Sequence, residues 1–285
     1  MGPKDANLPR SNLVSRLDLD SKMKNFKKYL KVWLRLTSYS FMTTLTTRFS
    51  LVLFLFGKIL RFVFLFSFLM LLLSKTKILV GYNLYQVAFF VLTYNLIDTV
   101  VQLLFREVYR FRPLIVSGNF DLVLVKPFNS LIRVLLGGPD IIDLFMAIPF
   151  LLGIIYLINK IGNISFFHFS FFIFLLTNAF LIATAFHIAV LALGILTTEI
   201  DNTIMVYRDL TRMGMVPIDI YKEPLRGFLT FVIPIGIMMT FPAKALMGFL
   251  SWQGIIVSFL IGGFLLWLSL KFWHYSLSKY SSASS

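Results

Sequence analysis

The sequence predicts an all-α polytopic integral membrane protein, with six transmembrane helices and an amphipathic interfacial helix before the first of them. The prediction rests on long apolar blocks separated by short basic connectors, a mean hydropathy of +0.83, and a charged fraction of only 14%. Lipid offers the backbone no hydrogen-bonding partner, so apolar runs of about 17–25 residues can cross it only as helices. This composition excludes an ordinary soluble domain.

The chain begins with polar residues 1–22, which have no hydrophobic period and are expected to form a disordered tail. A transmembrane domain is expected over residues 23–275, and a polar tail over 276–285. Within residues 24–48, apolar side chains gather near one helical face and basic side chains lie largely elsewhere. Such a helix lies in the headgroup plane of a membrane. The alternative is a soluble helix packed on another subunit.

Six apolar blocks are long enough to cross a bilayer as helices. The fifth is the weakest, because prolines punctuate it and the segment before it. Proline frees backbone groups that lipid cannot satisfy, so we expect this block to face protein or a cavity. The blocks are Ser50–Leu73, Leu84–Phe105, Ile141–Ile158, Phe166–Leu196, Leu225–Pro242 and Gly254–Leu270.

The distribution of basic residues predicts the orientation. If the N-terminus is cytoplasmic, 20 of the 27 Lys and Arg residues fall in the inside segments, which are 1–48, 106–133, 199–224 and 271–285. Four fall in the outside loops, as the positive-inside rule requires. We therefore expect an integral plasma (bacterial inner) membrane protein with both termini cytoplasmic. The net charge of +14 then reflects topology and anionic lipids, not nucleic acid, since it forms no patch with interleaved aromatics.

The first span contains two cations, Lys58 and Arg61, which share a helical face because they are three residues apart. At 1.5 Å per residue Lys58 lies roughly 13 Å deep, and Asp98 in the second span lies roughly 10 Å from the same surface. A charge within the bilayer is costly unless it is paired or wetted. We therefore predict that Lys58 or Arg61 approaches Asp98. The alternative is that both cations snorkel to the headgroups.

The connector 106–133 is the most distinctive polar stretch. Pro113 and Pro127 bracket it, a Ser117-Gly118-Asn119 turn lies at its centre, and five basic residues charge it. It is too long for a tight helix–helix turn, and its alternation of apolar and charged residues predicts short ordered helices. Loops of this length are often functional.

No convincing active site is present in the sequence. It contains no nucleotide-binding G-x-x-x-x-G-K-[ST] loop, no H-E-x-x-H and no G-x-S-x-G, and the absence of cysteine excludes thiolate metal sites. Asp140 and Asp143 share a helical face and could hold a cation, but such a pair more often caps a helix that begins near Gly138-Pro139. His168 and His187 are expected to be packed within apolar helices. No metal or cofactor is therefore expected.

Two segments resemble the permease subunits of ABC-2 type exporters. RFRPLIVSGNFDLVLVKPFNSL (110–131) is similar to that family's loop ending SG-x-(x)-x-x-L-x-x-P. VPIDIYKEPLRGFLTFVIPIGIMMTFPAKALMG (216–248) is similar to its C-terminal P-x-x-I-Y…R-x-F-L-x-F-x-I-P…P-A block. The likeness covers about residues 23–275. The polar extension before Met23 and the charges of the first span depart from it.

The resemblance implies a non-catalytic permease subunit of an ATP-driven exporter. Two such chains, identical or paralogous, would form the substrate pathway, and a separate ABC ATP-binding subunit would bind and hydrolyse ATP. The loop 106–133 would contain the coupling helix that docks on this subunit, with its contact around Gly118–Asp121. In this loop Arg110, Arg112 and Lys126 would pair with acidic ATPase residues or lipid phosphates. The resemblance implicates seven residues in all, namely Arg110, Arg112, Pro113, Gly118, Asp121, Lys126 and Pro127.

Two other classes of function stay open. A membrane-embedded transferase acting on lipid-linked substrates would need clustered carboxylates or histidines at the membrane surface, for which Asp140 and Asp143 offer the only start. An ion-coupled carrier would use Asp98 and the histidines. The transported substrate cannot be read from the sequence.

Overall fold

The computed structural model describes residues 27–42, 46, 48–76, 80–162 and 164–281, so the expected tail 1–22 lies outside it. All regular structure in this part of the chain is helical. The elements after helix 27–42 are α2 (Arg48–Thr76), α3 (Leu84–Phe105), η1 (Arg106–Arg110), α4 (Phe111–Val116), α5 (Phe120–Leu124), α6 (Ser130–Leu136), α7 (Ile141–Ile161), α8 (Phe166–Thr197), α9 (Ile200–Arg212), η2 (Ile218–Ile220), α10 (Leu225–Gly227), the π-helical η3 (Phe228–Val232) and η4 (Gly236–Thr240), α11 (Phe241–Leu246) and α12 (Trp252–Ser278).

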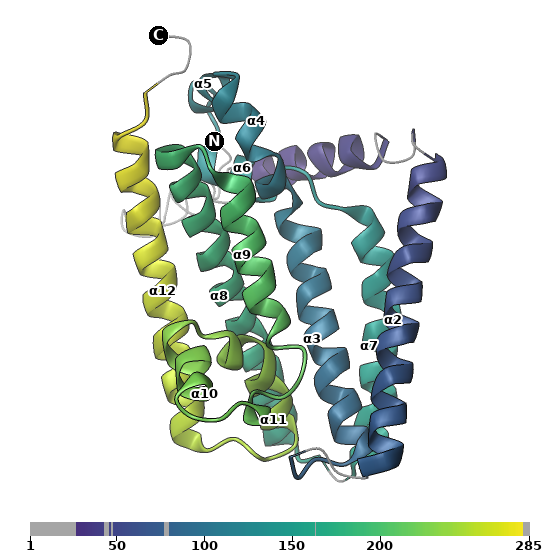
Figure 1. Cartoon of the computed structure of the whole chain (residues 1–285). Helices are drawn as coiled ribbons and strands as arrows, with labels where there is room; N and C mark the ends of the chain where they lie inside the picture. The colour runs from purple at the N-terminus through teal and green to yellow at the C-terminus, as the bar shows by residue number, and fades with distance from the viewer. Residues whose placement is uncertain (1–26, 43–45, 47, 77–79, 163, 282–285) are drawn as a thin grey trace, which may run out of the picture.

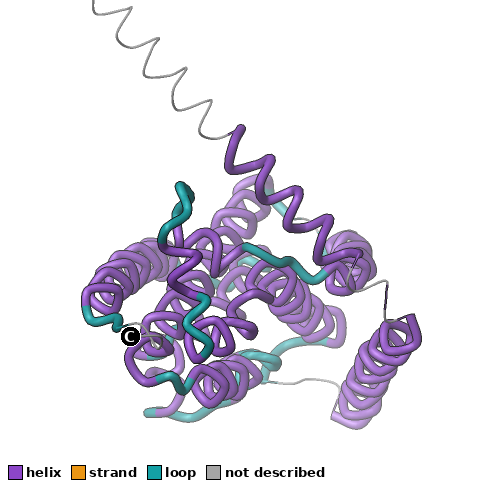
Figure 2. The backbone as a smooth tube through the Cα atoms, turned by 90° about the horizontal axis from the view of Figure 1, so that it is seen from above, coloured by secondary structure: helices purple, strands orange, loops and turns teal. Residues whose placement is uncertain are grey.

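The long helices run side by side as a bundle (Figure 1). One end of the bundle, called here the loop end, contains α4, α5 and the C-terminal end of α12. The opposite end, called the far end, contains α10 and α11. Seen from the loop end, helix 27–42 lies flat across the bundle, whereas α2 is seen nearly end-on (Figure 2). The sequence expectation that this first helix lies in the headgroup plane stays a prediction.

The helices begin where polar side chains cap them. Asn83 and Gln86 form a reciprocal capping box at the start of α3. The hydroxyls of Ser165 and Ser251 accept from the backbone N–H three residues on, at the starts of α8 and α12. Asp140 caps α7 in the same way, accepting from the Ile142 N–H at 3.0 Å. Helix α7 therefore begins at Ile141, slightly after the expected Gly138-Pro139.

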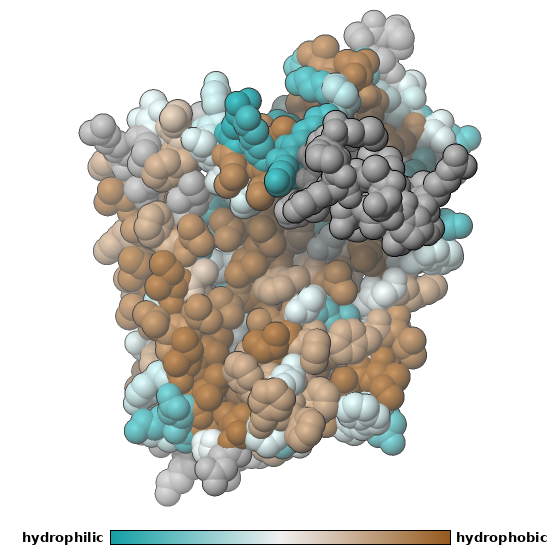
Figure 3. All heavy atoms as spheres, turned by 180° about the vertical axis from the view of Figure 1, so that it is seen from behind, coloured by the Kyte–Doolittle hydropathy of each residue, from teal (hydrophilic) through white to brown (hydrophobic). Residues whose placement is uncertain are grey.

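The outer surface of the bundle is apolar. Helices α3 and α8 supply most of the interior, whereas α7 and α12 expose most of their apolar side chains. Figure 3 shows hydrophobic residues covering the middle of the bundle, with hydrophilic residues gathered toward its two ends. Such a surface would be a severe liability in water but matches hydrocarbon. The chain is an integral membrane protein, as expected.

The number of spans is lower than expected within the described residues. Four helices are long and apolar enough to cross a membrane, and five if a bent pair counts as one span. Helix α2, with 29 residues, runs beside α7 but is not among these four (Figure 1). The expected count of six is therefore not confirmed, and crossing by α2 stays a prediction.

The fifth expected span is not one straight helix. Its two arms, Leu225–Val232 and Gly236–Leu246, meet at an angle of 81°. Both lie at the far end, whereas residues 199–224 were expected on the same side as the loop 106–133 (Figure 1). The chain instead returns toward the far end along α9. The sequence did not predict this path, because a helix as charged as α9 is not expected to run along a membrane-spanning bundle.

Helices α8 and α12 pack closely at a polar contact within the apolar bundle. The fully buried Asn178 donates from Nδ2 to the Ser258 carbonyl oxygen at 2.9 Å. Gly262 lies directly against the Asn178 amide, where a larger residue would overlap it. Small residues and interhelical hydrogen bonds of this kind hold helices together in lipid, where the hydrophobic effect cannot.

Candidate functional site

Segment 106–133 is built from short helices, as expected. Helix α3 continues through η1 and α4, so residues Leu84–Val116 form one rod of 33 residues. The rod ends at Ser117, whose hydroxyl donates to the Pro113 carbonyl oxygen at 2.7 Å. Gly118 then turns the chain with φ +72, a backbone conformation that residues with a side chain rarely adopt. The glycine is therefore needed to place α5.

Helix α5 is anchored by one face and exposes the other. Phe120 is fully buried and its ring packs at 5.2 Å against those of Phe111 and Tyr280. On the opposite side Leu122 is 59% exposed and Val125 is 78% exposed. The side of α5 that faces away from the chain is therefore apolar.

Asp121 fastens α5 to the end of the chain. Its carboxylate accepts from the Tyr280 hydroxyl at 2.9 Å. Burial, with the neighbouring Asp121 carboxylate, raises the pKa of Tyr280, so this phenol stays a neutral donor at physiological pH. Asp121 thus positions α5 from within its own chain.

The arginines of the segment are paired within the chain. Arg133 donates to Glu107 at 2.7 Å, and Arg110 lies 3.7 Å from the same carboxylate. Arg112 lies 3.5 Å from Asp201 at the start of α9. These pairs hold η1, α4, α6 and α9 together at the loop end. Pairing of Arg110 or Arg112 with a partner protein stays a prediction.

Pro127 and its neighbours contact helix 27–42. Lys28 Nζ donates to the Pro127 carbonyl oxygen at 3.1 Å. The rings of Tyr29 and Phe128 pack with centroids 4.5 Å apart. Helix 27–42 is therefore attached to the same segment that was singled out from the sequence.

Within the membrane part, Lys58 on α2 forms an ion pair with Asp143 on α7. The Asp143 side chain is only 3% exposed, against 31% for Lys58. Lys58 is thus paired rather than snorkelling. The sequence had favoured Asp98 as its partner and had left Asp143 as a helix cap.

Asp98 lies in the same small cavity as Lys58 and Asp143, of about 110 Å³, together with Arg208 of α9. Its carboxylate accepts from Gln102 at 2.7 Å. The predicted approach of Lys58 or Arg61 to Asp98 stays a prediction, and the Arg61 side chain lies outside the described part of the chain.

A comparison with family models now decides the class. Residues 38–284 match the model of the ABC-2 family transporter protein. The chain belongs to the ABC-2 transporter family. It is a membrane permease of an ABC-type exporter, as the resemblance implied. No curated protein and no solved structure matches it.

The structure places His187, His168, Asp140 and Asp143 of this ABC-2 transporter in local contacts with its helices. His187 is fully buried, and its Nδ1 lies 2.8 Å from the Ala183 carbonyl oxygen. The His168 backbone N–H closes the cap on Ser165, while Asp140 caps α7 and Asp143 pairs with Lys58. Among the described residues no group of three or more His, Cys, Asp or Glu side chains could hold a metal.

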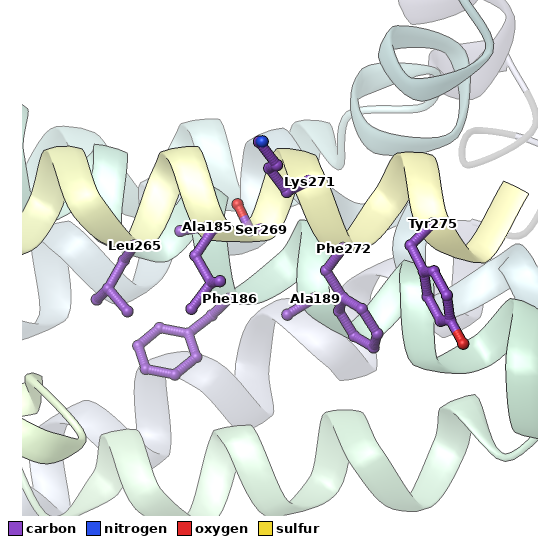
Figure 4. Close-up of a pocket in the computed structure, with 9 residues that line it drawn as sticks. Ala185, Phe186, Ala189, Leu265, Ser269, Lys271, Phe272 and Tyr275 are labelled. Atoms are coloured by element: carbon purple, nitrogen blue, oxygen red, sulfur yellow. The ribbon is translucent and has the colours of Figure 1, made fainter.

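An apolar groove of about 580 Å³ lies between α8 and α12 of this transporter. Figure 4 shows the rings of Phe186 and Phe272 on one side of α12, while the Lys271 amine points the other way. Its walls are almost wholly apolar, so they suit hydrocarbon chains. The groove offers no chemistry for catalysis.

A polar cluster at the far end was not predicted from the sequence. Asp219 of η2 accepts from Lys244 of α11 at 2.7 Å and from the Tyr82 hydroxyl at 2.9 Å. It therefore ties the bent pair to the start of α3. In the sequence Asp219 and Lys244 stand apart from each other in largely apolar surroundings. They are 25 residues apart, so no helical periodicity could pair them.

We expect Asp219→Asn to destabilise the far end, because Lys244 loses its counter-charge while only 14% exposed. A buried donor left without its partner costs about 1–3 kcal/mol. Thermal unfolding in detergent measures the loss. Glu223→Gln is the control, since Glu223 is 58% exposed in its pair with Arg226 and its loss should leave the transition nearly unchanged. Equal transitions for the two variants would contradict this role.

Proposed function

We propose that this permease works as a dimer and is powered by a separate ATP-binding subunit that docks on segment 106–133. The observation that carries the proposal is the exposed apolar face of α5. That face is held in a fixed position by the Phe120 packing and the Asp121–Tyr280 hydrogen bond. ATP would be bound by the partner chain, and no cofactor is proposed for this one.

The geometry of α5 suits mechanical coupling. A docked partner would cover Leu122 and Val125, which are otherwise left in water. Helix α5 follows the rod Leu84–Val116 after a single glycine turn at Gly118. A displacement of the docked surface would therefore be passed to a helix that crosses the membrane.

The polar face of α9 supports a pathway between two copies. This helix buries Ile200, Ile204 and Tyr207 against the bundle. Its other face exposes Asp209, which is 70% exposed and pairs with Arg212 at 2.8 Å. Charges facing hydrocarbon are costly, so this face needs water or protein over it. A second permease chain opposite α9 would enclose a polar pathway.

The orientation follows the charge distribution. We place the loop end and both termini in the cytoplasm, since the basic residues of helix 27–42 and segment 106–133 gather there. The membrane would be the bacterial inner membrane, and transport would run outward, as the usual role of the family implies. Helix 27–42 would then rest among the lipid headgroups.

The proposal is tested by co-expressing the chain with its ATP-binding partner. We expect the two to purify together and to hydrolyse ATP in a vanadate-sensitive way. The double variant Leu122→Glu/Val125→Glu should weaken the complex by about ten-fold or more, since it would bury two unpaired carboxylates in an apolar contact. Both side chains are exposed, so the fold should survive.

Lys279→Glu provides the control for this experiment. It places a similar charge at the loop end, on an exposed residue outside α5. The control complex should remain intact. Undiminished binding by the Leu122→Glu/Val125→Glu variant would exclude α5 as the docking element.

A further inference from the structure

A cavity of about 510 Å³ lies between helix 27–42 and segment 106–133. Three cations line it, namely Lys28, Lys126 and Arg133, and no carboxylate does so among the described residues. Much of the remaining wall is apolar, from Val32 and Leu36 on one side and from α4 and α5 on the other. The cavity thus combines positive charge with hydrocarbon-like walls.

The two lysines provide the free positive charge. Arg133 is neutralised by Glu107 at 2.7 Å. Lys28 donates one hydrogen to the Pro127 carbonyl oxygen, which leaves two donors on its ammonium group. Lys126 forms no ion pair with a described carboxylate. An anion between Lys28 and Lys126 would therefore meet donors that the protein does not satisfy.

Helix 27–42 sets the depth of the cavity in the membrane. Positions 28, 32 and 36 share the face that lines the cavity. The opposite face exposes Leu30, Leu34 and Phe41 to the surroundings. This helix lies flat at the end of the bundle (Figure 2), and a flat helix with such a stripe is expected to rest in the headgroup region. Lipid phosphates occupy the same level.

We propose that this cavity binds one anionic phospholipid, with its phosphate between Lys28 and Lys126 and an acyl chain along the apolar walls. The lipid would join helix 27–42 to segment 106–133, beyond the direct contacts that Lys28 and Tyr29 already make. A protein carboxylate could satisfy the same lysines but would leave the apolar walls empty. The inference rests on the proposed function only for placing the loop end at a membrane surface.

The test uses the purified permease chain without any ATP-binding partner, so that an acidic protein residue cannot occupy the site. The chain in detergent is titrated with phosphatidylglycerol or phosphatidylcholine, and bound lipid is counted by native mass spectrometry. We expect one phosphatidylglycerol to bind at least ten-fold more tightly than phosphatidylcholine. The Lys28→Gln/Lys126→Gln variant should lose this preference.

Two matched variants make the result specific. Lys27→Gln/Lys31→Gln removes equal charge from the same helix, outside the cavity, and should keep the preference for phosphatidylglycerol. Val32→Trp fills the cavity without changing charge and should lower binding of the lipid. Unchanged preference in the Lys28→Gln/Lys126→Gln variant, or equal losses in both double variants, would overturn the proposal. Lipid binding without ATPase binding would instead count against the proposed function alone.

Discussion

Replacing Gly262 with leucine is expected to separate α8 from α12 and to destabilise the folded permease strongly. A side chain here overlaps the Asn178 amide, which is fully buried and already donates to the Ser258 carbonyl oxygen. Overpacking costs about 1–3 kcal/mol. Losing an interhelical hydrogen bond in a membrane protein adds about 0.6 kcal/mol. Together these losses are about 1.6–3.6 kcal/mol, against the about 5–15 kcal/mol that typically stabilises a domain.

The neighbouring residue supplies the control. Gly263 has open space where a side chain would be added, so Gly263→Leu should leave stability nearly unchanged. Thermal unfolding in detergent, followed by helical circular dichroism, measures both variants. Adding Asn178→Ala to Gly262→Ala should recover part of the loss, because it removes the overlapping amide. Similar behaviour of the two leucine variants would show that α8 and α12 are not held by this contact.

Asp143→Ala should release α2 from α7, because it leaves Lys58 within the membrane without its counter-charge. Breaking a buried ion pair by removing one partner costs about 3–5 kcal/mol, whereas replacing both partners by apolar residues is often neutral. Lys58 keeps 31% exposure and can reach toward the headgroups, so we expect about 3 kcal/mol, the lower end of that range.

Two further variants separate this effect from a general loss of charge. Lys58→Met/Asp143→Leu should return stability close to that of the original chain. Asp201→Ala removes an exposed partner of Arg112 and should cost no more than about 1 kcal/mol. Hydrogen exchange in α2 should rise for Asp143→Ala alone. If exchange and unfolding match the original chain, the ion pair does not hold α2.

The spans that lipid alone dictates were predictable from the sequence. Helix α3 occupies the residues Leu84–Phe105 that were expected, and α8 begins at Phe166 as expected. The order within segment 106–133 was also predictable, because its turn residues and alternation leave few alternatives. In each case the controlling forces act between residues close in the chain.

The partner of Lys58 was not predictable. Depth follows from counting residues along a helix, and Asp98 and Asp143 both reach the same cavity as Lys58. The choice between them depends on which helices are neighbours and how each is rotated. Those quantities are set by the packing of the whole bundle, which one sequence does not reveal.

The bent pair shows a second limit. The prolines indicated irregular backbone near Leu225–Pro242, but the π-helical turns at η3 and η4 leave no comparable mark. The return of the chain toward the far end along α9 was not predicted, because the charged face of this helix suggests a segment exposed to water. In the structure α9 packs on the bundle through Ile200, Ile204 and Tyr207, and its charged face stays exposed, with Asp209 70% exposed.

The continuous rod Leu84–Val116 spans about 50 Å at the rise of an α-helix. At one extremity it meets the α5 turn, and at the other, just past Asn83, Tyr82 holds the Asp219 cluster. A stiff helix held at both ends must either rotate as a rigid body or bend at its 3₁₀ segment, Arg106–Arg110. In the first case a force applied at α5 would move Tyr82, and with it the contacts of Asp219 at the far end, at the same time.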